Sequence, residues 1–136
     1  LAQAIMDRYD WPLEHRISLM AKLAEYRFRA GDPQKARTGI GQARSLLNEQ
    51  NDSIVDIYRA GAFRSIAQVY QAIGDGPTSL SLYKQAVEEG VTNPNSRPRA
   101  EDLSATCVSM AQYAVEPDTQ LWTRIHQIRE GLGQPW

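Results

Sequence analysis

The sequence has little of several residue types that mark particular classes of protein. It contains a single cysteine, Cys107, so no disulfide can form within the chain. No apolar run approaches the length of a membrane span. The formal net charge is only −1, which gives the chain no strong attraction to nucleic acid or to an anionic membrane. We therefore expect neither as a partner, and the lone cysteine favours the cytoplasm without excluding the periplasm.

Residues that carry catalysis or bind metals are also scarce. The two histidines, His15 and His126, lie far apart in the sequence, whereas a metal site needs several convergent ligands. Cys107 lies in an apolar stretch that is typical of a small core residue rather than of an activated nucleophile. Adjacent acids such as Glu88-Glu89 point about 100° apart on a helix, so they form no catalytic dyad. Since a glycine-rich phosphate loop is also missing, the sequence predicts no enzyme, no cofactor and no metal site.

What the chain does contain is helical periodicity. With 136 residues, 42% of them hydrophobic and 23% charged, it has the size and composition of one globular domain. Apolar residues recur at spacings of three and four, and no segment alternates for long, so we expect helices and no sheet. Proline and glycine mark the ends of the helical segments. The expected helices cover residues 1–9, 13–30, 33–50, 54–73, 77–89, 98–115 and 119–130. The expected apolar stripe of the fourth helix is Ile54, Ile57, Tyr58, Ala62, Ile66, Val69, Tyr70 and Ile73.

Two stretches of the chain share one pattern of large and small side chains, which recurs 43 residues further on (Ala24 to Ala67, Ala43 to Ala86). Each copy contains a Gly-Asp turn, in which glycine can end one helix and aspartate can cap the next. Self-similarity at a period of this size indicates a helical repeat array, in which stacked helix pairs bury one another's apolar faces. The first copy is Met20, Leu23, Ala24, Gly31, Ala36, Ile40 and Ala43, and the second is Phe63, Ile66, Ala67, Tyr70, Gly74, Ser79, Tyr83 and Ala86.

These residues resemble the tetratricopeptide (TPR) repeat. In that family the first helix of a pair carries a bulky, a small and an aromatic residue, and the second helix carries a small, an aromatic and a small residue. The resemblance implies an all-α fold, a TPR-like right-handed helical-repeat solenoid of antiparallel helix pairs. The period exceeds the usual value of about 34 residues and is similar to that of the longer repeats in kinesin light chains. HEAT-type repeats of similar length are the structural alternative.

On this resemblance the whole chain, residues 1–136, is one solenoid domain. Residues 1–10 resemble the end of a preceding repeat, because residues 1–9 are similar to residues 43–51. Repeats are then expected over residues 13–50, 53–90 and 97–131. The first residue is leucine and no signal-peptide pattern follows it. We therefore expect a fragment or a processed form of a longer protein, whose targeting signal can lie elsewhere.

The third repeat keeps the pattern least well. Residues 109–112 echo residues 65–68, but we expect a following turn that is one residue shorter and lacks glycine. Leu121, Ile125 and Ile128 supply a second-helix stripe, so this repeat is also expected to form a helix pair. Such decay is typical of the end of an array, where the outer face meets water.

In TPR arrays the first helices line a concave surface that usually receives a peptide or a helix. The resemblance therefore implies a protein–protein interaction scaffold with a protein or peptide partner, whose identity the sequence does not give. Arg64, Gln68 and Gln71 fall off the apolar stripe of their helix, so we expect them to be free to face a ligand. The lysine and asparagine set with which some TPR domains hold a terminal carboxylate is absent. The predicted partner-binding residues are Arg64, Gln68, Gln71, Glu25 and Gln112.

Two other functions stay open. The chain can be a structural segment that self-associates through the open ends of the solenoid, or an accessory domain of a larger multidomain protein or enzyme. A sparse basic stretch from Arg27 to Arg44 can contact an acidic partner, although a solvated helix face is the commoner explanation of such a run.

Overall fold

The structure, a computed structural model, describes residues 1–133, so residues 134–136 of the predicted domain lie outside it. The described chain is all-α, as the sequence predicted, and contains no strand. Its elements are α1 (Ala2–Arg8), α2 (Leu13–Arg29), α3 (Pro33–Gln50), a short 3₁₀ helix η1 (Asn51–Ser53), α4 (Asp56–Ala72), α5 (Gly76–Val91), α6 (Ser96–Gln112) and α7 (Thr119–Gly131).

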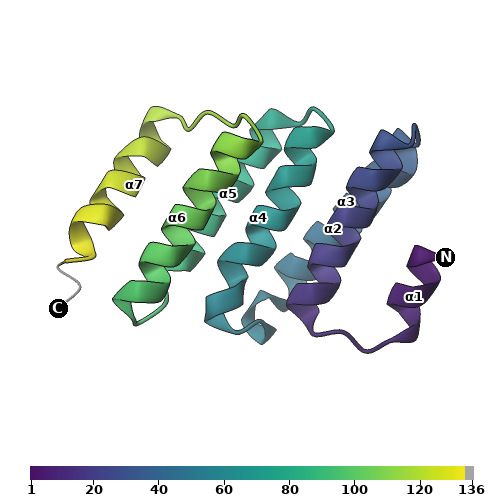
Figure 1. Cartoon of the computed structure of the whole chain (residues 1–136), viewed down its shortest axis with the longest axis horizontal. Helices are drawn as coiled ribbons and strands as arrows, with labels where there is room; N and C mark the ends of the chain where they lie inside the picture. Colours follow the sequence, from purple (N-terminus) through teal and green to yellow (C-terminus); the bar gives the residue numbers. More distant parts are fainter. Residues whose placement is uncertain (134–136) are drawn as a thin grey trace.

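The helices pack as pairs that lie side by side. α2 packs against α3, and α4 packs against α5. Neighbouring pairs meet through their first helices, since α2 contacts α4 and α4 contacts α6. Figure 1 shows α2, α4 and α6 in front and α3 and α5 behind them, with α1 and α7 at opposite ends of the long axis. The face formed by α2, α4 and α6 is called the front face below.

The two predicted Gly-Asp turns are confirmed, and they explain why each pair folds back sharply. Gly31 (φ 85°) and Gly74 (φ 87°) adopt the left-handed conformation, which side chains disfavour. The amides of Asp32 and Asp75 then donate to carbonyls in the last turn of the preceding helix, at 2.9 and 2.8 Å. Each aspartate side chain also caps the following helix, which begins with proline in its first turn.

The large–small packing predicted for the central pair is confirmed. Ala67 and Tyr83 are fully buried between α4 and α5, and Phe63 is 5% exposed. The hydroxyl of Ser79 donates to the carbonyl of Ala67 at 2.8 Å, which requires a close approach of the two helices. One cluster of buried apolar side chains continues from α2 to α7. The small residues therefore set the distance between the helices, and the aromatic rings fill the space beside them.

The start of α4 differs from the sequence prediction. We expected a helix from residue 54 with Ile57 and Tyr58 on its buried stripe, but these side chains are 44% and 47% exposed. Residues 51–53 form η1, and the helix begins only at Asp56. Ile54 is the residue of this run that reaches the core, at 1% exposure. The first turn of α4 therefore presents two large apolar side chains to solvent.

The connection between α6 and α7 is also unlike the expected one. α6 ends at Gln112 rather than at residue 115, and residues 113–118 form a link that is longer, not shorter, than the other turns. α7 contacts α5 more than it contacts α6, so the expected third pair is not closely packed. Ala111, which corresponds to the buried Ala67 in the sequence pattern, is accordingly exposed. The loose packing of α7 on α6 has a physical cause. Because α6 ends early, a six-residue link (113–118) separates the two helices instead of a tight turn.

A first prediction concerns Ala114, which takes a left-handed conformation (φ 53°) where the other two turns have glycine. Replacing it by glycine removes a strain of about 1 kcal/mol, offset in part by the greater freedom of glycine in the unfolded chain. We expect Ala114→Gly to leave the free energy of unfolding in urea unchanged or raised by up to about 1 kcal/mol. The control is Ala111→Gly, at an exposed position in the last turn of α6, which should lower the free energy of unfolding by about 0.5–1 kcal/mol. Equal losses in both variants would contradict the strained turn.

A second prediction tests the packing of α4 on α5. Ala67→Leu adds three carbons where no space exists, so we expect a loss of about 1–3 kcal/mol in the free energy of unfolding. Ala111→Leu makes the same change at the corresponding exposed position of α6, and it should shift stability by less than about 0.5 kcal/mol. Thermal melting of the two variants beside the parent protein checks this. If both lose the same stability, α7 packs on α6 as the sequence pattern first suggested.

Candidate functional site

The predicted partner-binding residues are distributed over the three helices of the front face. Glu25 belongs to α2, Arg64, Gln68 and Gln71 belong to α4, and Gln112 belongs to α6. The structure brings Arg64 and Gln68 into direct contact with α6, whereas Gln112 is exposed. The five residues therefore do not form one continuous cluster.

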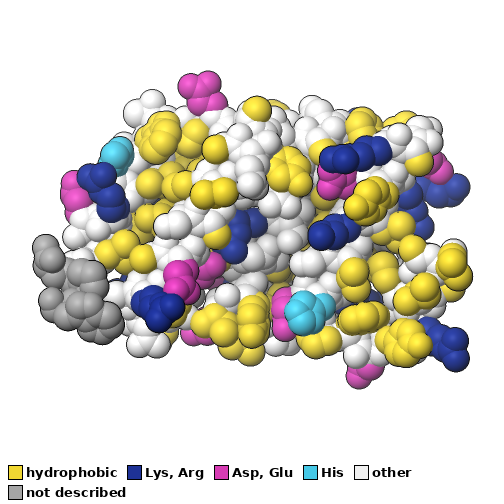
Figure 2. Space-filling model, in the orientation of Figure 1, with side chains coloured by type: hydrophobic (Ala, Val, Ile, Leu, Met, Phe, Trp, Pro, Cys, Tyr) yellow, Lys and Arg dark blue, Asp and Glu magenta, His cyan; other side chains and the backbone are white. Residues whose placement is uncertain are grey.

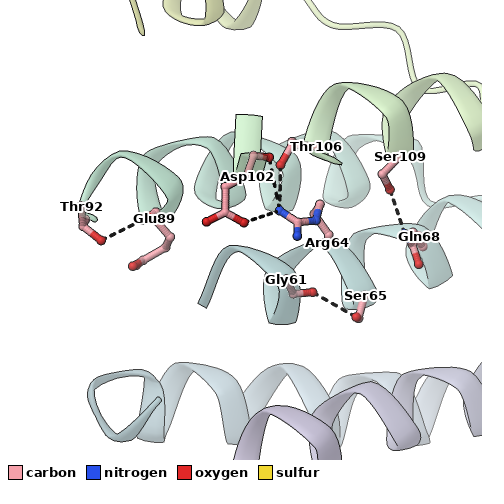
Figure 3. A network of polar contacts seen from close by, with 9 residues as sticks. All are labelled: Gly61, Arg64, Ser65, Gln68, Glu89, Thr92, Asp102, Thr106 and Ser109. Carbon is pink, nitrogen blue, oxygen red and sulfur yellow. Dashed lines mark hydrogen bonds and ion pairs between the residues drawn. The ribbon is translucent and has the colours of Figure 1, made fainter. Parts of the chain in front are cut away.

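Arg64 is held by α6 (Figure 3). Its Nη1 donates to Oδ1 of Asp102 at 3.2 Å, to the backbone carbonyl of Asp102 at 3.4 Å and to Oγ1 of Thr106 at 3.1 Å. The side chains of Arg64 and Asp102 are 16% and 12% exposed. The expectation that Arg64 is free to face a ligand is therefore wrong, because α6 places a carboxylate opposite the guanidinium. Among the described residues, its Nε and Nη2 have no hydrogen-bond partner, and Nη2 lies 3.5 Å from where a Cβ of Gly61 would be.

Burial makes the charge on Asp102 costly. Removal of the carboxylate from water raises its pKa, and the hydrogen bond and positive charge of Arg64 oppose this without cancelling it. The pair therefore fixes the position of α6 on α4 but does not make ionisation of Asp102 favourable for folding.

Gln68 also serves the fold. Its Nε2 donates to Oγ of Ser109 at 2.8 Å (Figure 3), and the same Oγ lies 2.7 Å from Oη of Tyr83. Burial raises the pKa of the Tyr83 phenol, which keeps it a neutral hydrogen-bonding group at ordinary pH. One serine hydroxyl thus joins α4, α5 and α6, and the expectation that Gln68 is free is wrong for the same reason as for Arg64.

The other predicted residues keep more freedom. Gln71 is half-buried and Gln112 is exposed. Glu25 is half-buried and forms an ion pair with Arg29 one turn further along α2. Burial raises the pKa of Tyr113, and the negative charge of Glu25 raises it further, so α2 and the end of α6 lie within electrostatic range of each other. A partner-binding role for the five residues stays a prediction.

Sequence reasoning missed a hollow of about 330 Å³ between the first turns of α2 and α4. Ile57 and Tyr58 line it from α4, Glu14 and His15 line it from α2, and Arg64 lies among its lining residues. Figure 2 shows hydrophobic side chains gathered along the lower edge of the front face, where these helices start. The available signal was the density of apolar residues over positions 54–58, which is more than one buried stripe can use.

A larger hollow of about 850 Å³ lies between α5 and α7. Its charged lining side chains are already engaged with one another or with nearby residues. Lys84 pairs with Asp118 at 2.7 Å, and Arg124 holds both oxygens of Glu88 at 2.7 and 2.8 Å. These contacts fasten α7 to α5, so they leave this hollow with no free charge with which to orient a ligand.

Within residues 1–133, no three His, Cys, Asp or Glu side chains come close enough together to hold a metal ion. Burial raises the pKa of the Cys107 thiol, which is the opposite of the shift that activates a nucleophile. None of the described helices combines the length and the apolar character that crossing a bilayer requires.

A third prediction follows from the Arg64–Asp102 pair. Arg64→Met leaves the carboxylate unpaired, and we expect a loss of about 1–3 kcal/mol in the free energy of unfolding at pH 7. Adding Asp102→Asn to this variant should recover most of the loss, because it removes the charge that burial disfavours.

The pH dependence gives a second measurement on the same variants. Since the pKa of Asp102 is raised in the folded state above its ordinary value of 3.8, ionisation costs stability as the pH rises through and above that value. The melting temperature of Asp102→Asn should therefore improve relative to the parent protein between about pH 3 and pH 7. An advantage that instead shrinks over this range would show that Arg64 outweighs burial.

A scan of protein-family models and searches of curated proteins and of solved structures found no match to this chain. We therefore infer function from the surfaces and contacts of the chain itself.

Proposed function

We propose that the chain is a TPR-like right-handed solenoid that acts as a protein–protein interaction scaffold and binds a peptide or a helix of its partner on the front face. The antiparallel pairs, the two Gly-Asp turns and the burial of Ala67 against Tyr83 support the repeat assignment. The observation that carries the binding proposal is the hollow between α2 and α4, with Ile57 and Tyr58 exposed beside it. Exposed aromatic and aliphatic side chains at a concave site are typical of contact anchors.

The chemistry of the hollow favours a largely uncharged partner segment. Its volume is near the lower end of the range for ligand sites, about 300–1,000 Å³, so it suits one or two side chains rather than a whole helix. Ile57 and Tyr58 offer apolar contact, while the unpaired edge of Arg64 offers N–H donors. Because Asp102 already neutralises much of the charge of Arg64, these donors suit a backbone carbonyl better than they attract an anion. Gln71, Glu25 and Gln112 can contact the remainder of such a segment along the front face.

We propose no catalytic activity for the chain itself. An accessory role within a larger protein or enzyme remains one alternative. Self-assembly is a second candidate, which the large apolar side chain of Val108 on α6, 55% exposed, favours.

A fourth prediction tests the hollow with a matched pair of tyrosines. Peptides that bind the 136-residue parent protein are first selected from a random display library. Their affinity for the Tyr58→Ala variant should be at least about tenfold lower than for the parent protein, a loss of about 1.4 kcal/mol in binding free energy. Isothermal titration calorimetry measures the affinity. Because the Tyr58 side chain is 47% exposed, the melting temperature of the Tyr58→Ala variant should stay close to that of the parent protein.

The control is Tyr26→Ala, which removes a tyrosine that is 66% exposed in α2 and does not line the hollow. We expect this variant to bind the selected peptides as the parent protein does. Selected peptides that bind Tyr58→Ala with unchanged affinity would place the binding site elsewhere, with the hollow between α5 and α7 as the next candidate.

A further inference from the structure

Three small residues, Ser18, Gly61 and Ser65, line the hollow between α2 and α4. The hydroxyls of Ser18 and Ser65 lie 3.2 Å apart, and that of Ser65 also donates to the carbonyl of Gly61 at 3.0 Å (Figure 3). These polar groups already satisfy one another, so the other lining residues decide which partner fits. The hollow lies between two neighbouring helices of the array and therefore depends on neither end of the chain.

The mouth of the hollow carries negative charge. Glu14 lines it from the first turn of α2, and Asp56 lies in the first turn of α4, directly before the lining residue Ile57. Both carboxylates are half-buried, and neither has an ion-pair partner among residues 1–133. A helix N-terminus supplies only about half a positive charge, so one carboxylate in each first turn leaves the mouth negative.

The basic residues of the same first turns do not reach the hollow. Arg16 follows Glu14 by two positions, which places it about 200° further around α2. Arg59 donates from Nε to the carbonyl of Ile54 at 2.8 Å, and its Nη1 lies 3.9 Å from Oε2 of Glu89 on α5. Both side chains therefore leave the charge at the mouth uncompensated.

The remaining lining residues add little positive charge. Arg64 is the one lysine or arginine that lines the hollow in the described chain, and Asp102 lies opposite its guanidinium at 3.2 Å. His15 counts as neutral at pH 7. The hollow thus combines apolar walls, N–H donors whose charge is largely neutralised, and an unpaired carboxylate.

We propose that the partner segment bound here carries a lysine or an arginine beside the large apolar side chain that enters the hollow. The proposal rests on the binding site put forward under Proposed function and names the chemistry of its partner. The apolar side chain packs against Ile57 and Tyr58, while a backbone carbonyl of the segment accepts from Arg64. The neighbouring cation pairs with Glu14, whose partial burial shields the pair from solvent. An acidic segment is disfavoured, because it would meet Glu14 and Asp56.

The test starts from the peptides selected on the parent protein from the random display library. We expect a lysine or an arginine beside an aromatic or large aliphatic residue in the peptides that bind. One such peptide is then synthesised as selected and with glutamine in place of its basic residue. Isothermal titration calorimetry measures both peptides against the parent protein and against Glu14→Gln. Each change alone should weaken binding about fivefold, and the two changes together should weaken it no further.

The matched control is Glu116→Gln. Glu116 is exposed in the link between α6 and α7 and does not line the hollow, and its replacement changes the net charge of the protein by the same amount. This variant should bind the selected peptide as the parent protein does. Added salt should weaken binding to the parent protein and to this control more than binding to Glu14→Gln.

The proposal is overturned if the selected peptides lack basic residues, if Glu14→Gln binds the basic peptide with the affinity of the parent protein, or if Glu116→Gln loses as much affinity as Glu14→Gln. If Tyr58→Ala weakens binding while Glu14→Gln does not, the proposed site stands and only the chemistry of its partner is wrong. Unchanged binding to both Tyr58→Ala and Glu14→Gln would remove the proposed site and this inference together.

Discussion

The close approach of α4 and α5 at Ala67 is the constraint on which the rest of the structure depends. The hydroxyl of Ser79 can reach the carbonyl of Ala67, at 2.8 Å, only because position 67 has no side chain beyond Cβ. This contact places Tyr83 so that its ring is fully buried and its Oη meets Ser109 of α6. The position of α6 thus follows from the packing of α4 on α5. The front face, with its hollow, exists because the first helices are held in this order.

The polar contacts between α4 and α6 cost free energy when one partner is lost, and they fix how the two helices are positioned. Apolar packing alone tolerates sliding, whereas Arg64 must meet Asp102 and Thr106, and Gln68 must meet Ser109. Partly buried groups of this kind are stable when all are paired and costly when one is lost. They make the front face a surface of fixed geometry. A binding segment then loses little free energy in ordering its receptor.

The sequence predicted the parts of the fold that depend on local signals. Glycine, aspartate and proline mark the turns at residues 31 and 74, and the spacing of small residues identifies the packed side of α4. It failed where an outcome depends on another helix. Arg64 and Gln68 look like free polar residues until α6 supplies their partners, and Ile57 looks like a core residue until η1 delays the start of α4. The end of α6 was misjudged because Ala114 adopts a conformation for which its side chain gives no signal.

Ion pairs attach α7 to α5, so the attachment of this helix depends on pH and on salt concentration. The hydrogen bond from Arg124 lowers the pKa of Glu88, and the hydrogen bond from Lys84 lowers that of Asp118. Carboxyl groups with lowered pKa values stabilise the folded state above their ordinary range and lose this effect as the pH falls through the lowered values. These pairs are solvent-accessible, so dissolved salt also weakens them. The core between α4 and α5 contains no such charges. Acid or salt should therefore detach α7 in a local opening, before the rest of the chain unfolds.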